Sequence, residues 1–279
     1  MGERLLSKVR CGGISSSAPR KRTVVAAITV VMAVALTLPA SALAALPSET
    51  PDQTLMVNGP VRTFAQVPGT NLLWVGGNFT QVQRRDGTVV ANVSNVAVFN
   101  SATDEYVDIA PMLGAGQTGS KVTDIVVHND DVVIGGTFSG PTSRKKNLVA
   151  ADGATGISVE PIRWFLDSEP LESVLATPDG KIYGGGIHLS AFDFATGNRL
   201  WRGAKTVVDD SLRPHVLAPG YRDLELEADG STIWAACGCD FVTAPDGTTN
   251  AARALVKLDV VDSNTGQADH DPSWVARGG

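Results

Sequence analysis

Short apolar runs that end in two small residues recur four times along the chain. In each run apolar side chains predominate, and Gly, Ala or Cys fills the last two positions. The four copies are residues 72–77, 131–136, 181–186 and 232–237. Their last residues lie 59, 50 and 51 positions apart. One strand pattern that returns about every fifty residues indicates a repeat architecture.

A second strand pattern lies about fifteen residues upstream of each run. Its first and fourth residues are apolar, and its third is a small polar residue or Asp. The copies begin at Val61, Val122, Leu171 and Tyr221. Gly, Pro, Asn and Asp separate the two patterns, and these residues accept the backbone angles of tight turns. Each unit is therefore predicted to contain a β-hairpin.

A third apolar strand follows each run and closes on a turn of the form Asp-x-x-Thr-Gly. The copies are 96–104, 148–156, 189–197 and 255–266. The first carries Asp104 in place of the turn Gly, and the fourth has Ala236 and Cys237 for Gly-Gly and three extra residues before its turn. Trp164, Trp201 and Trp274 follow in three units and are predicted to begin either the fourth strand or the link to the next unit.

Hairpin-linked strands in repeats of about fifty residues predict an all-β chain, a β-propeller of about four four-stranded blades. The paired glycines fit this fold because inner strands of neighbouring blades crowd together and Gly allows close backbone approach. A two-sheet sandwich with fortuitous glycines is the alternative. It does not require one pattern to recur four times in step.

The units resemble the repeats of secreted bacterial β-propellers of the delta-sixty type, with kelch repeats as the second-closest likeness. The segments Gly-Gly-Asn-Phe-Thr (76–80) and Gly-Gly-Thr-Phe-Ser (135–139) carry the resemblance, together with the Asp-x-x-Thr-Gly turns. It covers residues 57–275 and implies a fold, while it says little about function. Propellers commonly have about six to eight blades. We therefore expect an incomplete ring or a truncated gene product, whose open edge invites self-association.

The N-terminal segment has the organisation of a secretory signal peptide. Basic residues precede a largely apolar stretch at 24–38, and Pro39 and small residues up to Ala44 follow it. We expect cleavage near Ala44, with Ala42 as the second choice, and a secreted or cell-surface product without membrane contact. An uncleaved anchor is the alternative, because the extended run is long enough to span a bilayer.

The predicted organisation is a signal peptide at 1–44, a linker at 45–56 and propeller repeats at 57–279. The unit boundaries lie at about 57–118, 119–168, 169–217 and 218–279. The 279-residue chain has a net charge of −6, and removal of a leader of net charge +5 leaves −11. Such an acidic domain repels phosphate backbones, which argues against a nucleic-acid partner.

Cys237 and Cys239 are the two cysteines beyond the leader. In a flat strand their Cα atoms would lie about 7 Å apart, at the outer limit for a disulfide, so a bridge needs a kink at Gly238. The sequence leaves the bridge and two free thiols equally open. It predicts no metal site, because no second Cys or His pair lies at ligand spacing.

Three further polar residues depart from the repeat and are candidates for a site near the propeller axis. Asp124 and Asp223 share one position of the first strand, where the other copies have Thr63 and Ser173. Such residues more often hydrogen-bond neighbouring blades than bind a cation. His188 lies two residues after the small pair, where Phe79, Phe138 and Cys239 stand in the other units. We interpret it as a core histidine rather than a ligand.

No nucleophile elbow, phosphate loop or metalloprotease motif is present. We predict no catalytic, metal or cofactor-binding residues, and a non-catalytic exported module that binds protein or carbohydrate at the cell surface. The alternative is a secreted propeller hydrolase with paired carboxylates at the channel mouth. A kelch-type copper oxidase needs a cluster of Tyr and His ligands, and it is disfavoured because the chain has only three tyrosines.

Overall fold

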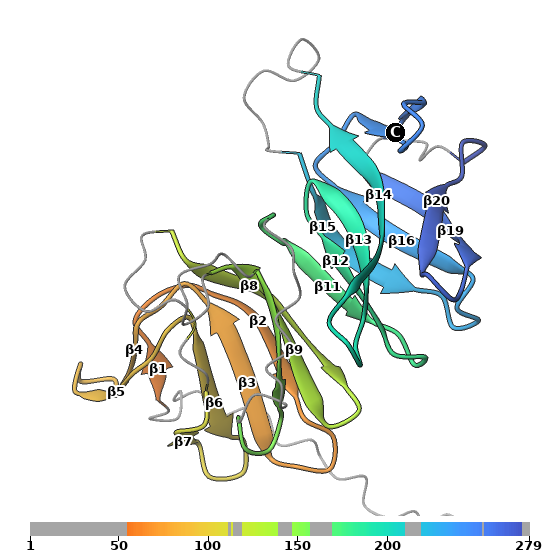
Figure 1. Ribbon diagram of the computed structural model, residues 1–279. Coiled ribbons are helices and arrows are strands. Elements are labelled where there is room, and N and C mark those ends of the chain that lie inside the picture. Colours follow the sequence, from red (N-terminus) through yellow and green to blue (C-terminus); the bar gives the residue numbers. More distant parts are fainter. Residues whose placement is uncertain are drawn as a thin grey trace, which may run out of the picture. The chain divides into compact units, whose positions relative to one another are not determined.

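The computed structural model describes residues 55–110, 113, 119–138, 147–156, 169–209, 219–252 and 254–274 (Figure 1). These residues belong to one compact unit, 53–279. The predicted signal peptide, its cleavage site and Trp164 lie outside the described residues. Within the described part, no helix is long and apolar enough to cross a bilayer.

Two four-stranded antiparallel sheets have strands that follow one another as hairpins, which is the topology of a propeller blade. We call them blade 1 and blade 4. Blade 1 contains β2 (Val61–Gln66), β3 (Leu72–Gly77), β6 (Val96–Asn100) and β7 (Glu105–Val107), and blade 4 contains β15 (Tyr221–Leu226), β16 (Thr232–Cys237), β19 (Leu255–Asp262) and β20 (Gln267–His270).

Blades 2 and 3 follow the same order. Three strands of blade 2 are described, and its fourth would fall on residues outside the described part. The strands are β8 (Lys121–His128), β9 (Asp131–Thr137) and β10 (Leu148–Asp152) in blade 2, and β11 (Ser173–Ala176), β12 (Lys181–Gly185), β13 (His188–Asp193) and β14 (Arg199–Val207) in blade 3. The prediction of an all-β propeller built of four repeated blades is confirmed.

Blades 1 and 4 each carry an extra hairpin between their second and third strands. These hairpins are β4 (Gln81–Gln83) with β5 (Val89–Asn92), and β17 (Phe241–Thr243) with β18 (Thr249–Ala251). Each pairs with a strand that precedes its blade, namely β1 (Met56–Val57) or the end of β14. Because of the second pairing, blade 3 extends into a six-stranded sheet.

The first strands of successive blades lie against one another, and the small residues of the second strands make this approach possible. A β-carbon added at Gly76 would lie 2.4 Å from Cγ1 of Val122 in blade 2. One added at Gly135 would lie 2.3 Å from Cγ2 of Val174 in blade 3. The recurring glycines are therefore where one blade receives the apolar side chains of the next.

Two features of the repeat vary between the blades. Asp104 replaces the turn glycine of blade 1 and adopts the left-handed conformation itself, with φ of 56°. Asp tolerates this region better than most residues. Trp201 lies within the fourth strand of blade 3, and Trp274 lies beyond β20, after the fourth strand of blade 4, so the two tryptophans occupy the two places that the sequence left open.

Candidate binding site at the junction of blades 3 and 4

The third residue of the second strand decides how each junction between blades is filled. The pairing register aligns Trp74, Val133, Tyr183 and Trp234 at this position. In the first three blades this residue is buried, and each belongs to an apolar cluster shared with the following blade. The size of this residue therefore helps to set how much space the junction retains.

Trp74 closes the junction of blades 1 and 2. Its side chain is 0% exposed, and its indole Nε1 donates a 3.0 Å hydrogen bond to the carbonyl oxygen of Gly153. Gly153 lies directly after the third strand of blade 2. A β-carbon there would lie 2.5 Å from the carbonyl oxygen of Asp130 and 2.8 Å from Cγ2 of Val67 in blade 1, so the glycine lets this backbone approach closely. The indole therefore meets both its packing and its hydrogen-bonding needs inside the junction.

Val133 occupies the same place between blades 2 and 3. The smaller side chain is accompanied by a ring pair, because His128 and Phe194 pack with their ring centroids 4.6 Å apart. Phe194 directly follows the third strand of blade 3, as Gly153 does in blade 2. In this junction the aromatic side chain that packs near Val133 is Phe194, which belongs to the following blade.

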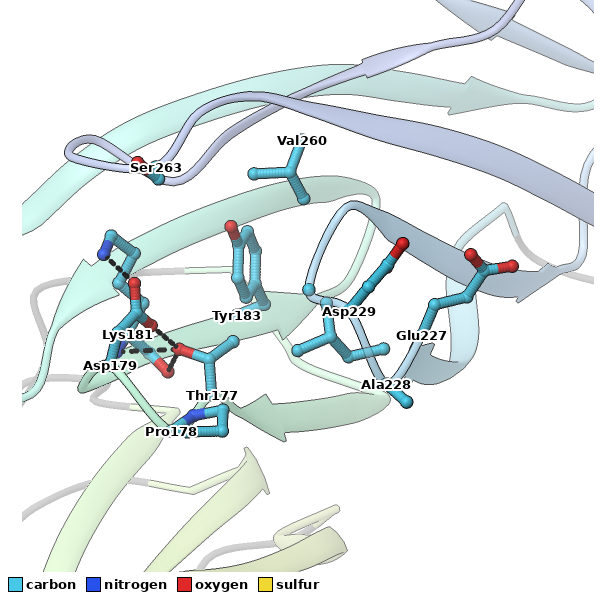
Figure 2. Close-up of a pocket in the computed structure, with 12 residues that line it drawn as sticks. Thr177, Pro178, Asp179, Lys181, Tyr183, Glu227, Ala228, Asp229, Val260 and Ser263 are labelled. Atoms are coloured by element: carbon cyan, nitrogen blue, oxygen red, sulfur yellow. Dashed lines mark hydrogen bonds and ion pairs between the residues drawn. The ribbon is translucent and has the colours of Figure 1, made fainter.

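Tyr183 occupies the junction of blades 3 and 4, and Val260 stands where Gly153 and Phe194 stand in the other junctions. A groove of about 480 Å³ opens beside them (Figure 2). This volume is within the usual range for ligand pockets. Residues of both blades line the groove: Thr177, Pro178, Asp179, Lys181, Tyr183, Leu226, Glu227, Ala228, Asp229, Gly230, Val260 and Ser263.

The rim of the groove is mainly anionic. Figure 2 shows Asp179 and Lys181 on one side, and Asp229 and Glu227 on the other. Lys181 donates to Asp179, and so does the hydroxyl of Thr177. The groove thus holds three carboxyl groups and one ammonium group, and that ammonium group is already engaged by one of the three.

Local contacts keep two of these carboxylates ionised. Burial raises the pKa of Asp179, but hydrogen bonds from Lys181 and Thr177 outweigh it and hold the pKa below its ordinary value. Hydrogen bonds from the backbone and side chain of Ser231 lower the pKa of Asp229. Glu227 accepts a 2.8 Å hydrogen bond from Nε1 of Trp234.

The floor of the groove is apolar, and its tyrosine is not set up as an acid or base. Burial, and then the charge of Asp179, raise the pKa of Tyr183 to about 12. Its ring is 1% exposed and offers no open aromatic face to a ligand. Leu226 and Val260 complete the apolar surface. The arrangement suits an apolar group that also carries a positive charge.

Asp124, one of the three predicted axial residues, lies on the first strand of blade 2 and bonds to both neighbouring blades. Its Oδ2 accepts the N–H of Val174 at 2.7 Å, and its Oδ1 accepts the hydroxyl of Thr63 at 3.3 Å. Oδ1 also accepts the N–H of Ile125. Burial raises the pKa of Asp124 more than these hydrogen bonds lower it.

Asp223 occupies the matching position of blade 4 and is exposed. Its Oδ1 accepts the N–H of Leu224 at 3.0 Å. In blade 3 the corresponding Ser173 is buried and donates to the carbonyl oxygen of Tyr221. Thus Thr63, Asp124 and Ser173 each hydrogen-bond the first strand of the following blade.

The structure places His188 differently from the sequence alignment. Blade 3 lacks the segment that separates the second and third strands in the other blades, so His188, the first residue of β13, corresponds to Asn95 and Ala254, which directly precede β6 and β19. β12 separates it from the innermost strand β11. Its Nδ1 lies 2.9 Å from Oε2 of Glu169, which also forms an ion pair with Arg202.

The sulfur atoms of Cys237 and Cys239 are bonded to each other. Their Cα atoms lie 5.3 Å apart, closer than the roughly 7 Å of a flat strand. β16 ends at Cys237, and Gly238 donates to the carbonyl oxygen of Gly220. The chain therefore turns between the two cysteines, which brings them within bonding range.

The groove itself was not predicted from the sequence. Asp179, Gly180, Asp229 and Gly230 were read there as hairpin-turn residues, and they are. The signal that distinguishes this junction is a difference between copies, because the third strand of blade 4 continues through Val260 to Asp262, three residues beyond the equivalent ends of the third strands of blades 2 and 3. Groups of His, Cys, Asp or Glu that could hold a metal ion are absent from the described residues.

No protein-family model matches the sequence, and no curated protein matches it. Among solved structures, the WD40 repeats of RRP9 are similar with a TM-score of 0.47 and 12% identity over 75% of this chain. U3-55K gives a TM-score of 0.41 and 10% identity over 75% of this chain. The designed Ika4 protein gives 0.40 and 12% over 72% of this chain and 96% of its own.

The chain spans about half the length of two of these structures, since it covers 52% of RRP9 and 52% of U3-55K. The assignment of the propeller fold rests on the blade topology and on the junction contacts described above.

Proposed function

We propose that the chain is an exported, non-catalytic propeller that binds a protein partner through the groove between blades 3 and 4. The observation that carries the proposal is the combination of an apolar floor with a rim of three carboxyl groups. A peptide segment with apolar side chains and a Lys or Arg complements both features.

Export is supported by two features far apart in the chain. Residues 1–44 have the composition of a signal peptide. The disulfide between Cys237 and Cys239 is of a kind that persists in oxidising compartments outside the cytosol. Mass spectrometry of the protein from culture medium would test both features. We expect an N-terminus near residue 45 and no free thiol.

A peptide fits the groove better than a sugar or a hydrolase substrate. Because Tyr183 is buried, the groove lacks an open tyrosine ring on which a sugar could stack. Glycoside hydrolysis needs one carboxyl group with a raised pKa as the general acid. The pKa of Asp179 and that of Asp229 are lowered instead.

The test uses a fluorescent octapeptide of alternating leucine and lysine, and a matched peptide in which glutamate replaces lysine. Fluorescence anisotropy with the mature chain is expected to show binding of the lysine peptide that weakens with added salt. The glutamate peptide should not bind. A chain that binds neither peptide, or both equally, contradicts the proposal.

The chain offers a matched control for general electrostatic attraction. Asp229 and Asp86 both precede Gly in a tight turn and accept a backbone N–H two residues on, but Asp86 lies on the blade 1 hairpin. Asp229→Lys is expected to weaken binding at least tenfold, while Asp86→Lys leaves it within twofold. Equal losses in the two variants would mean that the net charge of the chain, rather than the groove, attracts the peptide.

A further inference from the structure

Each junction between blades follows the same rule. The first and fourth residues of a first strand insert into the preceding blade, and they are buried in all three junctions. These residues are Val122 and Ile125, Leu171 and Val174, and Tyr221 and Leu224. The receiving surface consists of the first small residue of the second strand and the first residue of the third strand, such as Gly76 and Val96.

The same residues of blade 1 are exposed. Val61 is 49% exposed and Phe64 is 70% exposed. Their counterparts in blades 2, 3 and 4 are nearly inaccessible to solvent. Blade 1 therefore presents the apolar insertion surface of a junction, and among the described residues no blade receives it.

The receiving surface of blade 4 is also open. Leu255 is 37% exposed, whereas Val96, Leu148 and Leu189 at the same position are fully buried. Ala236 pairs with Leu255 and occupies the position of the first small residue. Both halves of a junction are thus present on one chain, on different blades.

The polar contacts of the junctions point to the same pairing. Thr63 accepts the N–H of Ile125, and Oδ2 of Asp124 accepts that of Val174, so in two junctions the third residue accepts the N–H of the fourth residue of the following blade. In the remaining junction Ser173 donates to the carbonyl oxygen of Tyr221 instead. Asp223 is the third residue of blade 4, and its Oδ1 accepts its own strand's N–H just as Oδ1 of Asp124 does. The donor that this rule assigns to Asp223 is the N–H of Phe64.

We propose that a second copy of this chain docks head to tail, with Val61 and Phe64 of one copy against Ala236 and Leu255 of the other. Asp223 of the receiving copy accepts the N–H of Phe64. The occupant is a second copy because the new interface continues the one that this chain forms three times within itself. A heterologous contact of this kind propagates or closes into a ring, depending on geometry.

Two residues make the contact weaker than the internal junctions. The β-carbon of Ala236 stands where Gly135 admits a methyl group of Val174, so the strands must separate slightly. Arg222 forms an ion pair with Glu172 across the junction of blades 3 and 4, but in the new contact it meets Arg62. We therefore expect a dissociation constant of roughly 10–500 µM. Ala236→Gly and Arg62→Glu should each tighten association about fivefold or more.

Sedimentation velocity of the mature chain at increasing concentration measures this association. Phe64→Asp is expected to raise the dissociation constant at least tenfold. Val90→Asp is the matched control, because Val90 is an exposed valine on the blade 1 hairpin and belongs to a different sheet from Phe64 and Leu255. Circular dichroism verifies that both variants fold. Loss of association in the control as well would show that the contact is not the one proposed.

The head-to-tail geometry has its own test. Leu255→Asp removes the receiving surface, and Phe64→Asp removes the inserting surface, so each variant retains one intact half. Neither variant alone should associate, but a mixture should form a 1:1 complex. A mixture that stays monomeric while the wild-type chain dimerises would indicate a different interface. A wild-type chain and an Ala236→Gly variant that both remain monomeric at millimolar concentration would overturn the proposal.

Discussion

The junction between blades 1 and 2 and the junction between blades 3 and 4 use the same positions of the repeat but retain different amounts of space. Trp74 fills the first and bonds to the backbone of blade 2. Tyr183 and Val260 occupy the second, where a groove of about 480 Å³ remains. The comparison teaches that the repeat fixes where a groove can form, and that a few variable residues distinguish the junction that has one.

The closed junction at Trp74 and the open junction at Tyr183 are expected to serve different purposes, the first stability and the second binding. Where the third residue of the second strand is fully enclosed and hydrogen-bonded, as at Trp74, the junction contributes to folding. Where charged turns border the junction, as at Asp179 and Asp229, its surface is available to a partner. Substitutions that exchange these roles are the direct way to test the comparison.

The largest expected effect is the loss of the enclosed indole. Trp74→Ala should lower the free energy of unfolding by about 3–5 kcal/mol, because it opens a cavity in the junction and frees the carbonyl oxygen of Gly153. Trp234→Ala at the partly exposed equivalent position should lose less than half as much. Urea unfolding of both variants gives the two values. Equal losses would mean that burial in a junction does not govern stability.

The sequence predicts the repeat register well because one periodic pattern encodes both strands and turns. The glycine pairs lie where inner strands approach closely, as at Gly76 against Val122. The turn of blade 1 forms without a glycine, because Asp104 adopts the left-handed conformation itself. These features follow from local backbone requirements, which are readable from residue type.

The remaining features depend on contacts between units, which the pattern does not encode. Counting residues from the glycine pair misaligned His188, because blade 3 lacks the segment that the other blades insert at that point. The groove lies at the junction where Tyr183 stands in the position of Trp74 and where the third strand of blade 4 is longer than those of blades 2 and 3. Tyr183 and Val260 are ordinary strand residues when they are read in the sequence. Only the packing of blade 3 against blade 4 brings them to one groove.

The second prediction concerns the close approach of the blades. Gly135→Ala should lower the free energy of unfolding by about 1–3 kcal/mol, because the new methyl carbon would lie 2.3 Å from Cγ2 of Val174. Ala236→Gly at the equivalent open position of blade 4 should change it by less than about 1 kcal/mol. Thermal and urea unfolding would distinguish the two. A tolerated Gly135→Ala would show that the blades separate freely.

A third prediction converts the open junction toward the closed one. Tyr183→Trp should partly fill the groove and weaken binding of the lysine peptide at least tenfold, which is about 1.4 kcal/mol. Thr177→Ser on the rim is the matched control and should leave binding within twofold, since its hydroxyl can still donate to Asp179. Undiminished binding by Tyr183→Trp, with the fold intact, would place the peptide elsewhere on the chain.

The smallest expected effect is the dependence of binding on pH above 4. Folding lowers the pKa of Asp179 and that of Asp229 from 3.8. Both carboxylates therefore stay charged in the folded chain at pH values where they would already be protonated in the unfolded chain. Their contribution to stability is therefore present above pH 3.8 and lost as pH falls through the lowered pKa values. Affinity for the lysine peptide should be nearly constant from pH 8 to about pH 5 and should fall below about pH 4. Anisotropy titrations across this range would measure it, and a loss of affinity already between pH 7 and 6 would assign the binding to a histidine rather than to these carboxylates.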